Sequence, residues 1–232
     1  MKLGIFTDPH YSSAELTCGR RYNSRSLAKI EAALARFAAE KCDLVVCLGD
    51  LIDREPTHEA EATNLAALAR VFDTAGLPAA VVRGNHDAFS LSKEDFYRIL
   101  GSSRYPADRV FEDKTLIFLD ACHFASGRPY APGDTDWTDT FLPDTDGLRA
   151  RLSAVPGEAI VLMHQNIDPN IRADHSLKNA AEVREILEQS RKVRLVLQGH
   201  YHPGTENIHN GILYRAFPAM CERNDAVFIS EV

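Results

Sequence analysis

Side chains of the types that bind metal ions recur in five short clusters along this sequence. The clusters are Asp8-x-His10, Gly49-Asp50, Gly84-Asn85-His86-Asp87, His164, and Gly199-His200-Tyr201-His202. Imidazole and carboxylate ligands together suit Mn²⁺, iron or Zn²⁺ better than Mg²⁺ or Ca²⁺, which prefer oxygen ligands alone. The ligand types do not choose among manganese, iron and zinc. The sequence therefore predicts a transition-metal site, provided that the fold brings the clusters together.

The spacing of apolar residues predicts the elements that must position these clusters. Buried strands are expected at 3–7, 44–48, 79–82, 159–163 and 193–197, and helices at 26–40, 58–75, 92–100 and 179–189. Shorter strands are expected at 110–112, 115–119, 205–209, 212–217 and 226–230. Asn210-Gly211 is a strong hairpin signal between two of them. The alternation predicts a largely parallel sheet with helices outside it, and the last short strands suggest a second sheet packed on the first.

Each metal-capable cluster follows the end of one of the five buried strands. In an open α/β sheet, ligands bind in the crevice beyond the carboxyl ends of the strands. A single aspartate or histidine after a strand is more often a turn residue, but five such clusters in order favour one converging site. The segment 125–143, which contains the single Trp137, is expected to be a long loop beside this site.

The composition limits the classes of function. The chain of 232 residues has 33 acidic and 26 basic side chains and a net charge of −7, which argues against a protein that binds long nucleic acids. No stretch approaches the roughly 20 apolar residues of a membrane helix, and no signal-peptide pattern is found. We expect a single domain over 1–232 in the cytoplasm. The five cysteines form no Cys-x-x-Cys pair and are interpreted as small buried hydrophobic residues.

The ordered set of motifs resembles the calcineurin-like metallophosphoesterase superfamily. The resemblance implies a four-layer αββα sandwich, in which helices flank two mixed β-sheets. It also implies two metal ions (Mn, Fe or Zn) bridged by Asp50. The implied ligands of the first ion are Asp8, His10 and His202, and those of the second are Asn85, His164 and His200.

The resemblance also implies hydrolysis of a phosphate ester or phosphoanhydride by a metal-bridging hydroxide. His86 is then the catalytic histidine that gives a proton to the leaving oxygen. Asp53 orients His86, unless it only caps a turn. Arg54 is a candidate phosphate ligand, although a solvated arginine is an almost equal alternative. Two divalent ions bring four positive charges, and the carboxylates of Asp8 and Asp50 neutralise two of them. The site therefore keeps about two positive charges that attract an anionic substrate.

The expected substrate is a small phosphorylated compound, and its identity stays open. Arg21 and Tyr22 are candidates to bind a second phosphate and stack a base, or they belong to a solvated helix start. Their spacing from Asp8 is similar to that of the manganese-dependent ADP-ribose/CDP-alcohol diphosphatase branch. Cyclic-nucleotide phosphodiesterases share the metal motifs, and a non-catalytic scaffold is an alternative of another class. The remaining histidines are interpreted as ordinary polar residues: His58, His123, His175 and His209.

Overall fold

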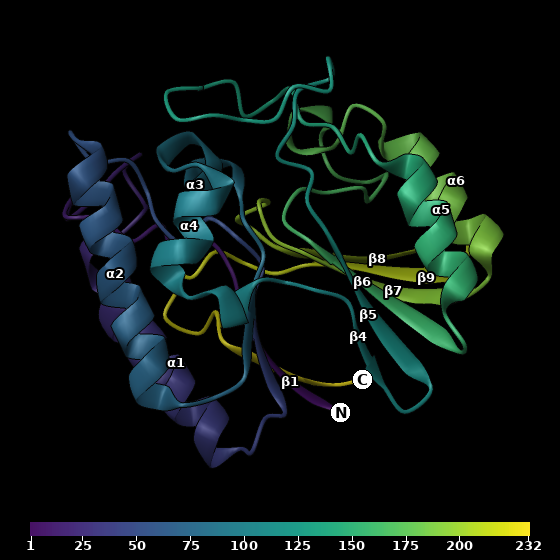
Figure 1. Cartoon of the computed structure of the whole chain (residues 1–232), viewed down its shortest axis with the longest axis horizontal. Coiled ribbons are helices and arrows are strands. Elements are labelled where there is room, and N and C mark those ends of the chain that lie inside the picture. Colours follow the sequence, from purple (N-terminus) through teal and green to yellow (C-terminus); the bar gives the residue numbers. More distant parts are fainter.

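Two β-sheets pack face to face, and helices cover the outer surface of each (Figure 1). The computed structural model describes all residues from 1 to 232. The four-layer αββα sandwich of two mixed sheets is therefore confirmed.

The first sheet has the strand order β10-β1-β2-β3. Its strands are β10 (Phe228–Glu231), β1 (Lys2–Phe6), β2 (Leu44–Cys47) and β3 (Ala79–Val81). The last three run parallel, whereas β10 pairs antiparallel with β1. The helices of this half are α1 (Ser26–Ala39), α2 (His58–Ala75), α3 (Asn85–Ser90) and α4 (Lys93–Leu100), with short 3-10 turns at Asn23–Arg25 and Ser102–Arg104.

The second sheet has the strand order β4-β5-β6-β7-β9-β8. Its strands are β4 (Arg109–Phe111), β5 (Lys114–Leu119), β6 (Glu158–Met163), β7 (Val193–Gln198), β9 (Ile212–Ala216) and β8 (Thr205–His209). The four inner strands are parallel, and the edge strands β4 and β8 are antiparallel to their neighbours. Helices α5 (Thr145–Ala154) and α6 (Ala180–Ser190) cover its outer face, and a 3-10 turn spans Ala173–His175.

The inner strands are buried on both faces, which explains their continuous apolar runs. In β1, Leu3 and Ile5 belong to the cluster between the sheets, whereas Phe6 packs into the cluster under the helices. The opposite faces follow from the two-residue period of a strand. Gly4 lies on the helix side, where a Cβ would come within 2.5 Å of the Phe37 ring. The absence of a side chain there lets α1 approach the sheet.

The structure corrects the expected elements in three places. The strand expected at 226–230 does not join the other C-terminal strands, because β10 returns to pair with β1 in the first sheet. The C-terminal strands β8 and β9 form the expected hairpin at Asn210-Gly211, but β9 also pairs parallel with β7. Helices α3 and α5 were not expected. The segment 125–143 contains no helix or strand, as expected of a loop.

Candidate active site

The loops that follow β1, β2, β3, β6 and β7 bring the five clusters together. The first three strands belong to one sheet and the last two to the other, so the site lies between the carboxyl ends of both sheets rather than over one sheet. The cluster Gly84-Asn85-His86-Asp87 leads directly into α3. The convergence expected from the sequence is therefore present, although the sequence did not indicate two sheets at the site.

The first group of side chains contains Asp8, His10 and His202. The Nε2 atoms of the two histidines are 3.2 Å apart. Asp8 Oδ1 lies 3.4 Å from His202 Nε2 and 3.7 Å from His10 Nε2. All three residues are buried. Three inward-facing atoms that can bind a metal ion therefore surround one small space.

The second group contains Asn85, His164 and His200. His164 Nε2 lies 3.2 Å from Asn85 Oδ1 and 3.2 Å from Asp50 Oδ2. The ligand atoms of Asp50, His164 and His200 lie within 4.8 Å of one another. Asp50 Oδ2 is also 3.5 Å from His10 Nε2 in the first group. Asp50 thus stands between the two groups and can contact a ligand in either.

Hydrogen bonds at the Nδ1 atoms of the histidine rings fix which ring nitrogen carries the proton. This makes both groups of side chains suitable for cations. His164 Nδ1 donates a hydrogen bond to the Leu48 carbonyl at 2.8 Å. In the neutral ring, Nε2 then carries a lone pair, yet it faces the oxygens of Asp50 and Asn85, which are also acceptors. Such facing acceptors repel one another unless a proton or a cation lies between them.

The first group shows the same feature. The Nδ1 atom of His202 pairs with Glu222 Oε1 at 2.5 Å, and that of His10 lies 3.5 Å from Asp53 Oδ2. Both Nε2 atoms are therefore directed inward. Asp8 Oδ1 and His200 Nε2 are buried without any hydrogen-bond partner. A bound cation satisfies these atoms, so the residues present fit two metal ions.

The electrostatics of the site are dominated by its carboxylates. Burial alone lowers the pKa of His10, but the neighbouring Asp53, Asp8 and Asp50 outweigh it and raise the pKa to about 10. Burial also lowers the pKa of His164. The charge of Asp50 outweighs this effect and raises that pKa to about 9. His10 and His164 thus favour positive charge because of the carboxylates, whereas burial lowers the pKa of His200 well below its usual range. A metal cation can meet the same demand.

The backbone of the site is strained at the residues that follow the strands. Asp8, His10, Asp50 and His200 have φ values of 52°, 47°, 53° and 64°, in the left-handed region that residues other than glycine rarely adopt. Such conformations persist where the surrounding structure enforces them, and they are concentrated at functional sites. Gly84 is needed for a different reason: its φ of −93° is ordinary, but a Cβ there would overlap the carboxylate of Asp50.

His86 lies at the start of α3, between the buried groups and the solvent. Its backbone N–H donates to Asp50 Oδ1 at 2.8 Å. Its ring Nδ1 lies 2.8 Å from Asp53 Oδ1, and the ring stands perpendicular to that of His10 at 4.5 Å. The expected contact between Asp53 and His86 is therefore present. Asn23 also donates to Asp53, at 3.1 Å, which fixes the carboxylate.

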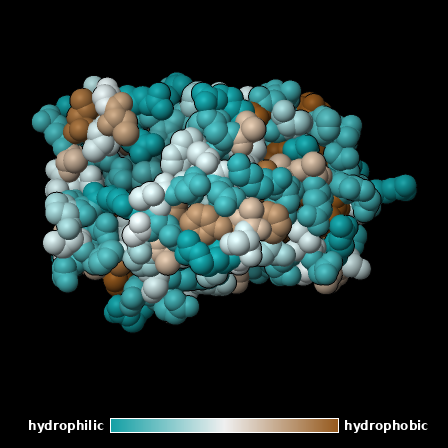
Figure 2. All heavy atoms as spheres, turned by 90° about the horizontal axis from the view of Figure 1, so that it is seen from above, coloured by the Kyte–Doolittle hydropathy of each residue, from teal (hydrophilic) through white to brown (hydrophobic).

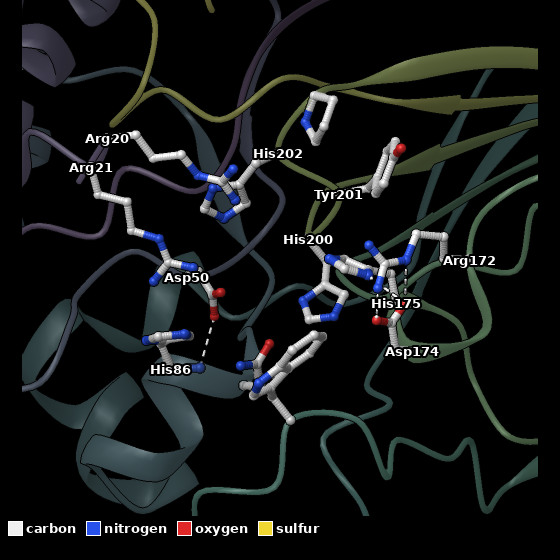
Figure 3. Close-up of a pocket in the computed structure, with 13 residues that line it drawn as sticks. Arg20, Arg21, Asp50, His86, Arg172, Asp174, His175, His200, Tyr201 and His202 are labelled. Carbon is white, nitrogen blue, oxygen red and sulfur yellow. Dashed lines mark hydrogen bonds and ion pairs between the residues drawn. The ribbon is translucent and has the colours of Figure 1, made fainter. Parts of the chain in front are cut away.

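A cavity of about 390 Å³ opens directly above these groups. Figure 3 shows Arg20 and Arg21 on one side and Arg172, Asp174 and His175 on the other, with His200 between them. Trp137 and Tyr201 add aromatic surface to the lining. The surface seen from above is mostly hydrophilic, with hydrophobic residues scattered over it (Figure 2). The cavity combines positive charge with aromatic faces, which suits a phosphorylated compound with a planar group.

The structure separates the three substrate-binding candidates. Arg21 lines the cavity, and its Nη1 lies 3.7 Å from Asp53 Oδ2. Tyr22 does not line it. Its side chain is exposed, and the guanidinium of Arg25 lies 4.5 Å from its ring centroid. Arg54 is also outside the lining, because its side chain donates to the carbonyl of Asp134.

Two groups of cavity residues were missed in the sequence. His175, interpreted as an ordinary loop histidine, packs against Trp137 at 5.0 Å and His200 at 5.5 Å. Arg172 and Asp174, which form an ion pair, lie in the same segment. The loop expected beside the site does reach it through Trp137. Nothing in the local sequence around His175 indicated the cavity, since its partners come from distant segments.

The cysteines largely follow the expectation. Cys42, Cys47, Cys122 and Cys221 are buried, whereas Cys18 is exposed. Cys18 therefore corrects the interpretation that all five are buried hydrophobic residues. None of the helices combines the length and the hydrophobicity that a membrane span requires.

Comparisons with known proteins agree on a family. The family model described as calcineurin-like phosphoesterase matches residues 1–204. A protein named probable cyclic nucleotide phosphodiesterase from Psychrobacter arcticus is 25% identical over 193 residues, which are 78% of this chain and 64% of that protein. A similarly named protein from Fibrobacter succinogenes is 25% identical over 177 residues, 69% of this chain and 57% of that protein. The chain thus spans less than two thirds of the length of these curated relatives.

Solved structures show the same fold. A dimetal phosphatase from Danio rerio superposes with a TM-score of 0.86 at 16% identity, covering 100% of this chain and 92% of that one. TT1561 of Thermus thermophilus superposes with a TM-score of 0.63 at 14% identity, covering 95% of this chain and 90% of that one. At these identities the similarity concerns the fold.

Proposed function

The chain belongs to the calcineurin-like phosphoesterase family, and from this premise we propose that it is a two-metal hydrolase of small, nucleotide-type phosphoesters. One observation carries the proposal. The two buried donor groups share Asp50 and lie directly below a cavity lined by arginines and aromatic rings. A phosphate held in that cavity sits next to both groups.

The proposed ligands follow the geometry. Asp8, His10 and His202 hold one ion, Asn85, His164 and His200 hold the other, and Asp50 contacts both. When bound, the two ions supply the activated water and the positive charge that displacement at phosphorus requires. The buried, strained positions of Asp8 and Asp50 keep these ligands in place before the ions bind.

His86 provides proton transfer to the leaving oxygen. It lines the cavity, and Asp53 accepts a hydrogen bond from its Nδ1, so Nε2 is the atom available to the substrate. The Asp53 carboxylate thereby orients the ring so that a proton on Nε2 reaches the leaving oxygen. Arg21, whose Nη1 lies 3.7 Å from Asp53 Oδ2, neutralises a non-reacting phosphate oxygen.

A cyclic nucleotide is the second candidate substrate. Two relatives are named probable cyclic nucleotide phosphodiesterases, and their similarity extends over most of this chain. The cavity volume of about 390 Å³ accommodates a nucleoside monophosphate, and the ring of Trp137 offers a face for its base.

A panel assay tests the proposal. The purified chain, stripped of metal and reloaded with Mn²⁺, is given an aryl monoester, an aryl diester, ADP-ribose, CDP-choline and a cyclic nucleotide. We expect metal-dependent release of product from a nucleotide-type ester, and little from the stripped protein. A preference for the cyclic nucleotide selects the second candidate. Two bound ions with no hydrolysis of any compound contradicts the proposal and favours a non-catalytic scaffold.

The variant His86→Asn separates metal binding from catalysis. His86 is not among the proposed metal ligands, so this variant should bind both ions yet hydrolyse slowly. If the variant has the same metal content and the same activity as the wild type, His86 takes no part in the reaction.

A further inference from the structure

Cys221 is a buried thiol beside the first group of donor atoms. Its side chain is fully buried. Its sulfur lies within 4.8 Å of a ring nitrogen of His10 and of one of His202, and these nitrogens lie within 4.8 Å of each other. This is the mutual spacing of atoms that share one metal ion. None of the sequence motifs includes this cysteine.

The chain path that leads to Cys221 explains its position. After β9, the backbone N–H of Ala219 donates to the carbonyl of His202 at 3.0 Å. Two residues later, the N–H of Cys221 donates to the carbonyl of Asp8 at 3.1 Å. The segment 219–221 therefore ties together the loops that carry His202 and Asp8. On the other side, the Cys221 carbonyl accepts from the N–H of Tyr22 at 3.0 Å.

An independent observation shows that this space needs a ligand. Asp8 Oδ1 is completely buried and has no hydrogen-bond partner. It lies 3.4 Å from His202 Nε2, which in turn faces His10 Nε2 at 3.2 Å. Three acceptor atoms thus face one another beside the thiol. A cation at this point would contact all three, and the two histidines are the ligands that it would share with Cys221.

We propose that Cys221 is an additional, sulfur ligand of the first metal ion and biases that position toward soft ions such as Zn²⁺ over Mn²⁺. The inference rests on the proposed function, because it assumes that His10 and His202 hold an ion. On binding, the S–H bond breaks, its proton leaves to solvent, and a sulfur lone pair forms the bond to the ion. Thiolates favour zinc and other soft ions, whereas oxygen ligands suit manganese.

Cobalt spectroscopy tests the ligand directly. The full-length chain is stripped of metal and loaded with Co²⁺, and its near-ultraviolet spectrum is compared with those of Cys221→Ser and Cys42→Ser. A thiolate bound to cobalt gives an intense charge-transfer band that histidine and carboxylate ligands do not give. Cys42 is the matched control, since it is a buried thiol in the cluster under α1 and α2.

The proposal requires the band in the wild type and in Cys42→Ser, and its loss in Cys221→Ser. It also requires the preference for Zn²⁺ over Mn²⁺ in competition to fall by about tenfold or more in Cys221→Ser. Two bound cobalt ions without the band, or a band that persists in Cys221→Ser, overturns the proposal while the proposed function stands. A chain that binds no cobalt contradicts both.

A second measurement covers the case in which Cys221→Ser does not fold. Cadmium NMR of the loaded wild-type chain reports the ligand atoms without any substitution. A resonance shifted downfield into the range of thiolate-bearing sites supports the sulfur ligand. Two resonances in the range of nitrogen and oxygen ligands overturn it.

Discussion

The hydrogen bond between Asp53 and His86 gives a prediction whose size follows from the structure. Asp53→Asn keeps the shape of the side chain and an oxygen that accepts from His86 Nδ1, but it removes the negative charge. At the observed separation of 2.8 Å, a unit charge pair is worth about 1.5 kcal/mol in water and about 6 kcal/mol at an effective dielectric constant near 20.

The exposure of the two side chains decides between these limits. Asp53 is 12% exposed and His86 is 23% exposed, so the pair is neither fully solvated nor fully buried. An intermediate value of about 3 kcal/mol corresponds to a loss of about 10²-fold in kcat, provided that the charge on His86 matters in the rate-limiting step.

The assay compares two leaving groups. A good leaving group, such as nitrophenolate, needs little protonation, whereas an alkoxide needs it fully. We therefore expect Asp53→Asn to lose about 10²-fold on an alkyl ester and much less on a nitrophenyl ester. His86→Asn should show the same selectivity, and the double variant should lose no more than His86→Asn alone.

Metal content must be measured in the same samples, because Asp53 Oδ2 also lies 3.5 Å from His10 Nδ1. Asp53→Asn should retain both ions. Equal losses on both esters with intact metal content would refute the reasoning that Asp53 acts through His86. Loss of an ion would instead assign Asp53 to the support of the first metal position.

Further predictions concern the shared ligand, the cavity and the metals. Asp50→Asn should lose metal and activity together, because the charge between both groups is gone; elemental analysis with two ions retained would refute the sharing. Gly84→Ala should lower both activity and stability, since its Cβ overlaps the Asp50 carboxylate; thermal unfolding and metal content measure this, and wild-type values in both would show that the backbone adjusts freely. Trp137→Ala should raise KM for a nucleotide by about tenfold, from the roughly 1–3 kcal/mol of a stacked base, and leave KM for an aryl monoester unchanged; equal effects on both would exclude stacking. Removal of both metal ions should lower Tm by about 16–32 °C relative to protein with each ion at 1,000 times its Kd, since each of the two sites contributes about 4 kcal/mol; an unchanged Tm in calorimetry would contradict a metal requirement of the folded site.

Much of the strand framework could be predicted because the inner strands are buried on both faces. Their apolar runs end where Asp8 and Asp50 follow β1 and β2, and this position relative to the strand is visible in the sequence. Two sheets were expected, but which inner strand belongs to which sheet is not visible, because a run buried on both faces looks the same in either sheet. The pairing of β10 with β1 could not be predicted either, because β10 is a short, half-exposed edge strand whose partner lies at the other end of the chain.

The two missed helices have different explanations. Helix α5 has local signals, since Asp144 accepts from the Gly147 N–H at its start and Leu148 and Leu152 are spaced by one turn. Helix α3 has none. Its first turn is fixed by Asp87, which accepts from the N–H of Ile52 in a distant loop at 3.0 Å. Such long-range contacts leave no periodic pattern.

The residues that line the cavity could also be predicted only in part. Arg21 was found because it follows the Asp8 and His10 motif closely in sequence. His175 was not found, because its place depends on Trp137 and His200, which lie far from it along the chain. The metal-capable clusters carry strong local signals, whereas the residues that line the cavity are brought together by loops alone.

Anomalous diffraction from crystals loaded with Mn²⁺ tests the central claim most directly. The account predicts two peaks per chain, one among Asp8, His10 and His202 and one among Asn85, His164 and His200, with Asp50 in contact with both. A single peak, or two peaks that do not share Asp50, would contradict the proposed two-metal centre.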